Sequence, residues 1–194
     1  MAEKTDAQPL IDSAARLRDA LLRLDYGTRP AWVYHPLEYA WEAHCTYLSR
    51  YAATRKQVVF MGMNPGPWGM AQTGIPFGEV GSVRDWLGIC KPVGHPEREH
   101  PKRPIEGFNC TKSEVSGRRL WGLMKQRYVS PDAFFEQQVI LNYCPLAFMA
   151  DSGRNVTPDK TPRAMRDLII SRCDSHMARV LELRSPAYVV GIGA

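Results

Sequence analysis

Two kinds of apolar pattern alternate along the chain and predict strands separated by helices. Three short runs are apolar at every position and are expected to be strands, at residues 58–61, 139–141 and 188–190. A run without polar alternation is typical of a parallel strand with both faces covered, so these strands are expected to be buried. Each run ends at a residue suited to a loop, namely Gly62, Asn142 or Gly191.

Helical spacing of apolar residues predicts four helices around these strands, at residues 8–24, 36 to about 51, about 116–127 and about 162–183. Thr161 is expected to cap the last helix and Pro162 to be its first residue. Strands that alternate with helices predict the α/β class, here a three-layer α/β/α sandwich with a central, mostly parallel sheet.

The length of 194 residues suits a single domain with a sizeable core. We expect residues 1–194 to form that domain, with residues 1–25 as an N-terminal helical extension. No apolar stretch approaches the length of a membrane span, and the first residues lack the features of a signal peptide. We therefore expect no membrane partner, a cytoplasmic (bacterial nucleoid) or nuclear location, and a monomer.

The five cysteines are widely spaced and contain no C-x-x-C pair. This spacing disfavours a disulfide framework, a zinc site and an iron–sulfur cluster. We expect neither a metal nor any other cofactor.

The net charge of +5 is concentrated in one part of the chain. From Arg84 to Arg127 there are ten Lys or Arg against five Asp or Glu, which equals the excess of the whole chain. Clustered positive charge suits a polyanion such as DNA, but on charge alone a solvated basic face is an equal alternative.

Ligands of open α/β sheets bind at the carboxyl ends of the strands, so the loops after Met61 and Leu141 are the first candidates for a site. The loop at residues 62–69 has three glycines and two prolines, a composition that lets backbone N–H groups approach a ligand closely. It matches neither G-x-x-x-x-G-K-[ST] nor G-x-G-x-x-G, which disfavours nucleotide binding by those motifs. An ordinary strand-to-helix turn is the alternative, although it explains less well why Asn64 stands between rigid neighbours.

Residues 60–80 resemble the first motif of the single-strand-selective monofunctional uracil-DNA glycosylases. The core G-x-N-P-G at residues 62–66 is shared with mismatch-specific uracil/thymine glycosylases, whereas the longer run is specific to the first family. Further stretches resemble the same family, and together they cover roughly residues 30–194: residues 100–104, 113–117, 142–146 and 152–155.

The resemblance implies a uracil-DNA glycosylase-like fold and a role for each matched residue. Asn64 would hold the attacking water, Phe77 would stack on the extruded base, and Asn142 would read the edge of uracil. Met63 and Gly66 would line the base pocket. The implied DNA contacts lie in two segments: Ser116, Gly117 and Arg118, and Ser152, Gly153 and Arg154.

The implied reaction is removal of uracil, and of related damaged bases such as oxidised 5-methyluracil derivatives or deaminated purines, by hydrolysis of the N-glycosidic bond. The base must first leave the duplex. Once extruded, it is suited by an aromatic face for stacking and by an amide for hydrogen bonding to its edge. An amide is no strong base, so Asn64 can only orient water. Without the resemblance, Phe77 is better explained as a core aromatic, Asn142 is equally well explained as a buried polar residue, and residues 152–155 could be a simple turn.

The family has a second motif, H-P-S-P-x-N, which this chain lacks, since His-Pro-Ser occurs nowhere in it. Either the sequence is cut short or a short protein has lost the motif, and we favour the first explanation. We accordingly expect the last strand and helix to be missing and the chain alone to be feebly active or inactive. A non-catalytic nucleic-acid-binding module that retains the base pocket, and a small-molecule nucleotide binder, are the alternative functions. The histidines, which show no nucleophile or ligand spacing, are expected at the surface or behind the site, with His95 and His100 able to touch DNA.

Overall fold

The computed structural model describes residues 6–28 and 30–193, and its centre is a parallel sheet. Strands β2 (Val58–Gly62), β3 (Gln138–Asn142) and β6 (Tyr188–Ile192) lie in the order β3-β2-β6. The register pairs Gly62 with both Asn142 and Ile192, so the three carboxyl ends meet at one edge. The three strands and their parallel direction confirm the α/β class predicted from the apolar runs.

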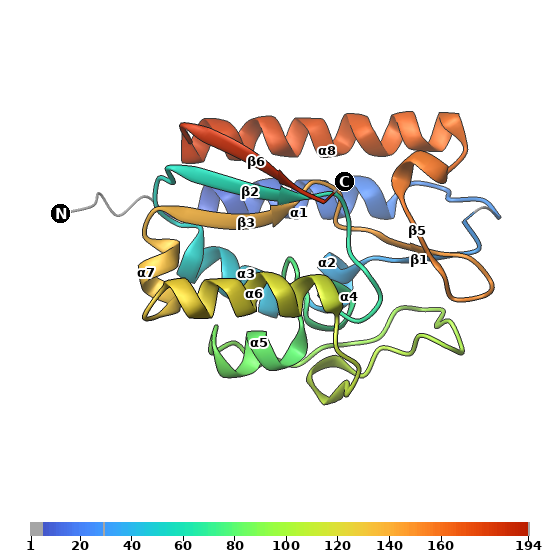
Figure 1. Cartoon of the computed structure of the whole chain (residues 1–194). Helices are drawn as coiled ribbons and strands as arrows, with labels where there is room; N and C mark the ends of the chain where they lie inside the picture. The colour runs from blue at the N-terminus through green and yellow to red at the C-terminus, as the bar shows by residue number, and fades with distance from the viewer. Residues whose placement is uncertain (1–5, 29, 194) are drawn as a thin grey trace.

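Helices surround this sheet (Figure 1). They include α1 (Gln8–Leu22), α3 (Trp41–Tyr51), α6 (Val115–Arg127) and α8 (Arg163–Arg184). Figure 1 shows α8 running beside β6, α1 behind the strands and α6 below β3. Leu10 and Ala14 of α1 belong to the same buried cluster as Val59 and Val139, so α1 is an integral part of the core. None of these helices, within the described residues, is long and apolar enough to cross a membrane.

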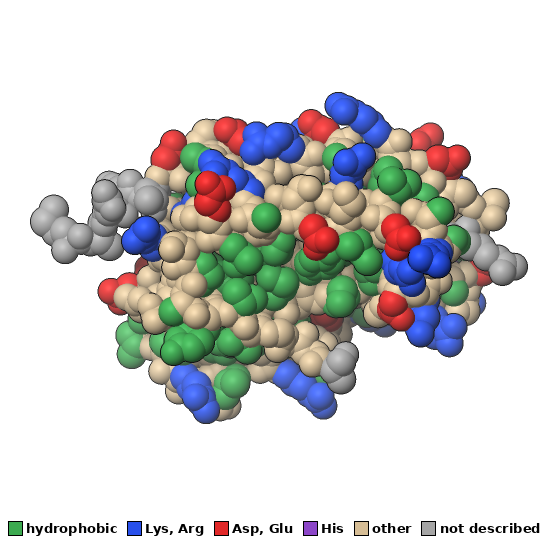
Figure 2. Space-filling model, turned by 90° about the horizontal axis from the view of Figure 1, so that it is seen from above, with side chains coloured by type: hydrophobic (Ala, Val, Ile, Leu, Met, Phe, Trp, Pro, Cys, Tyr) green, Lys and Arg blue, Asp and Glu red, His purple; other side chains and the backbone are tan. Residues whose placement is uncertain are grey.

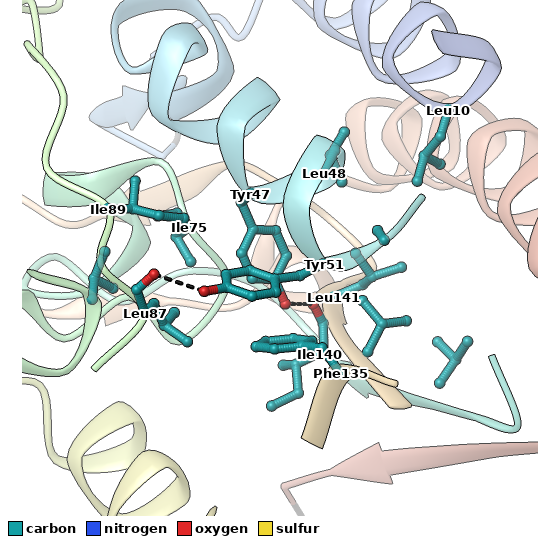
Figure 3. Close-up of a cluster of buried hydrophobic side chains, with 14 of the residues drawn as sticks. Leu10, Tyr47, Leu48, Tyr51, Ile75, Leu87, Ile89, Phe135, Ile140 and Leu141 are labelled. Atoms are coloured by element: carbon teal, nitrogen blue, oxygen red, sulfur yellow. Dashed lines mark hydrogen bonds between the residues drawn. The ribbon is translucent and has the colours of Figure 1, made fainter. Parts of the chain in front are cut away.

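Two buried tyrosines join α3 to its surroundings in the main core (Figure 3). The Tyr47 hydroxyl donates to the Ile140 carbonyl of β3 at 2.7 Å, and the Tyr51 hydroxyl donates to the Leu87 carbonyl at 2.7 Å. The Tyr51 ring stacks on Phe135 with centroids 4.1 Å apart. Both hydroxyls therefore have a partner, as buried polar groups require, and α3 is fixed relative to the sheet.

A second, antiparallel sheet was not predicted, because its strands have only two or three residues. It consists of β1 (Trp32–Tyr34), β4 (Ala147–Met149) and β5 (Asn155–Val156), in the order β1-β4-β5. The remaining elements are short and carry loops across the strand ends: α2 (Pro36–Tyr39), α4 (Met70–Thr73), α5 (Val80–Asp85), η1 (Gly107–Asn109), α7 (Pro131–Phe135) and η2 (Pro158–Lys160).

Two predictions about helix boundaries were wrong. The helix expected from residue 36 to 51 is divided at Ala40, whose φ of −119° and ψ of 30° lie outside the helical range. The last helix begins at Arg163 rather than Pro162, and Thr161 does not cap it. The Thr161 hydroxyl instead donates to the Pro158 carbonyl of the preceding turn, which takes it away from the helix N-terminus.

The expectation that residues 188–190 are buried was also wrong. Tyr188, Val189 and Val190 are 63%, 49% and 40% exposed. The reason is that β6 pairs only with β2 and forms an edge of the described sheet. Figure 2 looks down on the α8 side of the molecule and shows apolar side chains gathered in the middle of this face.

Candidate active site

The end of β2 brings together an aromatic ring and an amide from distant parts of the chain. A Cβ added to Gly62 would lie 2.6 Å from two ring atoms of Phe77 and 2.7 Å from Oδ1 of Asn142. Ordinary Cβ contacts are 3.4 Å or longer, so only glycine fits here. The structure therefore places Phe77 and Asn142 side by side over the backbone of Gly62.

Phe77 has an unusual backbone, with a φ of +53°. A non-glycine residue with positive φ is uncommon and strained, and such residues cluster at functional sites. The Phe77 carbonyl accepts from the Glu79 N–H at 2.8 Å and from the Trp121 indole N–H at 2.9 Å. These two bonds hold the residue, so its half-buried ring is fixed at the strand end rather than enclosed in the core.

Asn142 ends β3, and its amide lacks a strong partner among the residues the structure describes. Its Nδ2 lies 3.3 Å from the thioether sulfur of Met70, which is a weak acceptor. Its Oδ1 faces Gly62 and the Phe77 ring. A half-buried amide with an unused donor and acceptor can bind the edge of a pyrimidine, which presents one N–H between carbonyl oxygens.

Asn64 is oriented by backbone carbonyls on one side of its amide. Nδ2 donates to the Leu146 carbonyl at 3.2 Å and more weakly to the Pro65 carbonyl at 3.4 Å. Because the nitrogen is committed, Oδ1 is left to accept a hydrogen bond from water. Backbone hydrogen bonding between β2 and β3 continues past the ends of the two strands, because the Cys144 N–H donates to the Met63 carbonyl at 2.8 Å. That hydrogen bonding holds the Asn64 loop beside the residues after Asn142.

Met63 lies at the mouth of a hollow and is 56% exposed. The hollow has a volume of about 420 Å³ and is lined by residues from the ends of β2 and β6 and by Tyr143, including Gly62 and Gly193. This volume is in the range of small-molecule sites, about 300–1,000 Å³. Gly62 is shared between the hollow and the Phe77–Asn142 pair, so the two are adjacent.

Glu114 packs against the loop at residues 62–69, which carries Asn64. The sequence did not predict this role. Its carboxylate would lie 2.4 Å from a Cβ at Gly69, 2.7 Å from one at Gly117 and 3.4 Å from one at Gly66. It also caps α6 by accepting from the Gly117 N–H at 3.2 Å. Burial raises the pKa of this carboxyl, and the nearby Glu79 raises it further. Gly66, predicted to line the pocket, thus rests against Glu114.

The first predicted DNA-binding segment lies at the start of α6. Ser116 and Arg118 are exposed, whereas Gly117 is buried. A Cβ at Gly117 would lie 2.3 Å from the Phe77 carbonyl, which gives this glycine a packing role beneath the stacking ring. Contact with DNA stays a prediction for all three residues, and the exposed pair is the part that a strand can reach.

The second predicted segment packs against the basic loop at residues 100–104, in which only His100 had been given a role, as a possible contact with DNA. A Cβ at Gly153, whose φ is +81°, would lie 3.2 Å from the guanidinium carbon of Arg103 and 3.3 Å from the His100 ring. Arg103 also lies over the Trp68 ring, 5.1 Å from its centroid. A continuous surface therefore runs from the Asn64 loop through Trp68 and Arg103 to the exposed Ser152 and Arg154.

The histidines were expected at the surface or behind the site, and three of the five are buried. His35, His44 and His100 are only 6%, 6% and 1% exposed. Burial lowers the pKa of His35 and of His44 to about 4, so both are neutral at pH 7. His100 bonds to the Asp151 carbonyl at 3.1 Å and holds the Ser152 turn in place. Within residues 6–28 and 30–193, no group of three His, Cys, Asp or Glu is placed to hold a metal ion.

These features define an α/β protein in which an aromatic ring and two asparagine amides lie at the carboxyl ends of parallel strands. No family model matches the chain. It is 47% identical to the single-strand selective monofunctional uracil DNA glycosylase of Bos taurus, over 96% of this chain and 69% of the relative. It is 46% identical to the enzyme of the same name from Mus musculus, over 96% of this chain and 67% of the relative.

The chain belongs to the single-strand selective monofunctional uracil DNA glycosylase family. The match takes in 187 residues, more than the range from about residue 30 predicted from motifs. The crystal structure of SMUG2 from Pedobacter heparinus is similar in fold, with a TM-score of 0.57 over 93% of this chain and 86% of that one. At 16% identity, that likeness concerns the fold alone.

Proposed function

We propose that this protein is a monofunctional DNA glycosylase that removes uracil and related damaged bases from DNA. The observation that carries the proposal is the contact of Phe77 and Asn142 over Gly62, because it provides a stacking face and a pyrimidine-reading amide in one place. Family membership supports it independently, since the relatives are named as uracil-DNA glycosylases.

The proposed reaction starts with extrusion of the base, which the duplex otherwise hides. The ring of Phe77 stacks on the base, a contact worth about 1–3 kcal/mol. Asn142 donates from Nδ2 to a carbonyl oxygen of uracil and accepts the imide N–H at Oδ1. Water held by Oδ1 of Asn64 then attacks the sugar carbon as the base leaves as an anion, and the proton that this water loses goes to solvent, from which the departed base is protonated. The amide orients this water and does not deprotonate it.

The DNA strand is proposed to follow the surface from Trp68 through Arg103 to Arg154. Trp68 offers an aromatic face, and Arg103 and Arg154 offer cations for phosphates. Ser116 and Arg118 at the start of α6 would contact the strand on the other side of Phe77. The protein is proposed to act as a monomer, in the bacterial nucleoid or in the nucleus.

The direct test is single-turnover release of uracil from a labelled oligonucleotide, with enzyme in excess. Slow release from a uracil-containing strand, with none from a matched thymine-containing strand, is the expected result, in keeping with the feeble activity expected of this chain. The control is Asn64→Ala, which keeps the fold and removes the group that holds water. Failure to release uracil, or equal release by the control, would contradict the proposed activity.

The second candidate is a nucleic-acid-binding module with little catalytic power. It is favoured by the surface from Trp68 through Arg103 to Arg154, because an aromatic face and cations serve DNA binding and take no part in bond cleavage. It predicts uracil-selective binding without release. Binding of uracil and thymine oligonucleotides, measured on the protein used for the release assay, separates the two functions.

A further inference from the structure

A second hollow lies away from the candidate active site, between α1 and α8. Its volume is about 320 Å³. It is lined by the middle parts of the two helices, and no residue of the Asn64 loop, Phe77 or Asn142 takes part. The size is at the lower end of the range for small-molecule sites, about 300–1,000 Å³.

The sequence explains why the two packed helices leave this space. Ser13, Arg16 and Ala20 follow one another at spacings of three and four on α1, and Arg172, Ser175 and Arg179 do the same on α8. Residues at these spacings share a helix face. On each helix face, small residues leave room for the hollow and arginines border it.

The hollow is strongly positive, because little negative charge faces it. Arg16 and Arg172 are exposed and form no ion pair with any residue in the described part of the chain. Only Arg179 is paired, with Glu182 on the outer side at 2.7 Å.

Two carboxylates on the same helices are held by other groups. Asp12 accepts from the Gln8 side chain at 2.7 Å, and Asp174 accepts from the Tyr143 hydroxyl at 2.6 Å.

The floor of the hollow is polar but carries no charge. His176 Nδ1 and the buried Ser13 hydroxyl form a hydrogen bond of 2.8 Å. Burial lowers the pKa of His176 to about 4, so the ring is neutral at pH 7. The Ser175 hydroxyl donates to the Ser171 carbonyl at 2.9 Å. One neutral donor of the Ser13–His176 pair is left over, and the charged donors at this site belong to the arginines.

We propose that this hollow binds a small multivalent oxyanion, such as the phosphate groups of a phosphorylated small molecule. Guanidinium groups bind phosphate through paired, charge-assisted hydrogen bonds, and two helices present them here from opposite sides. A single halide or carboxylate would leave most of these donors unused. The site is separate from the base pocket, so it would allow a phosphorylated ligand to bind while DNA is bound elsewhere.

The test is thermal unfolding of the whole chain with inorganic pyrophosphate, with potassium chloride holding ionic strength constant. A ligand of the folded state stabilises it by RT ln(1 + L/Kd), where L is the free ligand concentration, so the rise in melting temperature at a fixed concentration reports the affinity. Arg16→Gln and Arg172→Gln are each expected to weaken pyrophosphate binding about tenfold or more, because each removes charged hydrogen bonds. Arg163→Gln is the matched control, since Arg163 is an exposed arginine of α8 outside the hollow.

Further measurements separate a specific oxyanion site from a general charge effect and from a DNA-binding surface. Inorganic phosphate should bind more weakly than pyrophosphate if a multivalent ligand is preferred. Equal weakening by Arg163→Gln, or no stabilisation of the unmodified protein at constant ionic strength, would overturn the proposal. So would an equal loss of duplex DNA binding in Arg172→Gln, because the hollow would then be part of the DNA surface. Melting temperatures without ligand show whether each variant is folded.

Discussion

Replacing Gly62 with alanine tests the geometry on which the site depends. The new Cβ would lie 2.6 Å from the Phe77 ring and 2.7 Å from Asn142 Oδ1, whereas ordinary contacts begin at 3.4 Å. The ring or the amide must therefore move by roughly 1 Å, and a displacement of that size in a catalytic site can cost about 10²-fold in rate. The backbone of Gly62 pairs normally with Asn142, so the strand itself accepts alanine.

The expected result is a loss of about 10²-fold in single-turnover uracil release, with a loss of about 1–3 kcal/mol in the free energy of unfolding from overpacking. Selective binding of uracil over thymine oligonucleotides should fall in parallel, which gives a readout even if turnover is slow. Gly122→Ala is the matched control. Nothing lies within 4 Å of its added Cβ, and it is inside α6, so the protein should gain about 0.5–1 kcal/mol at an unchanged rate.

A folded Gly62→Ala protein with unaltered uracil release and base selectivity would refute the reasoning. It would mean that Phe77 and Asn142 do not need their present positions. Equal losses in Gly62→Ala and Gly122→Ala would also refute it, because a general effect of the Gly-to-Ala change would then explain the result.

Three other predictions follow from single groups. Asn142→Asp should abolish the selectivity for uracil by replacing the Nδ2 donor with a second acceptor, and unchanged excision and base preference would exclude the proposed role. Arg154→Gln should lower the slope of log K for DNA against log salt by about 0.9, the value for one phosphate contact, with an unchanged slope as the contrary outcome. For His44 the folded-state pKa is lowered from 6.5 to about 4, so its contribution to stability is complete above pH 6.5 and is lost as the pH falls towards 4. Denaturant titrations at several pH values should show that the free energy of unfolding falls less between pH 6.5 and 4 for His44→Gln than for the unmodified protein.

The sequence predicted the parallel sheet well because strands covered on both faces carry an apolar signal of their own. Residues 58–61 and 139–141 matched β2 and β3 to within a residue at each end. The same apolar signal wrongly predicted that residues 188–190 are buried. It shows that a strand has apolar side chains to bury, but not whether other elements cover them. The strands of the second sheet are too short for any periodicity, and their pairing depends on residues more than a hundred positions apart, such as Trp32 and Met149.

For the site, the motif identified Asn64, Phe77 and Asn142, but it could not show how they meet. The contact of Phe77 and Asn142 with Gly62 joins segments up to 80 residues apart, and only the strand register creates it. Glu114 was missed for the same reason. A glutamate at the start of a helix is usually a cap, and nothing local shows that its carboxylate also lies against Gly66 and Gly69.

The strained backbone of Phe77 connects these observations. A positive φ costs of order 1–3 kcal/mol and persists only where the surroundings fix it. Here the Phe77 carbonyl accepts two hydrogen bonds, and Gly117 leaves space for that carbonyl at the start of α6. Gly117 is also the residue whose N–H Glu114 caps, and Glu114 in turn lies against the loop that carries Asn64. The Asn64 amide and the Phe77 ring are therefore held by one set of contacts, so a change at Glu114 or Gly117 should impair the proposed roles of both.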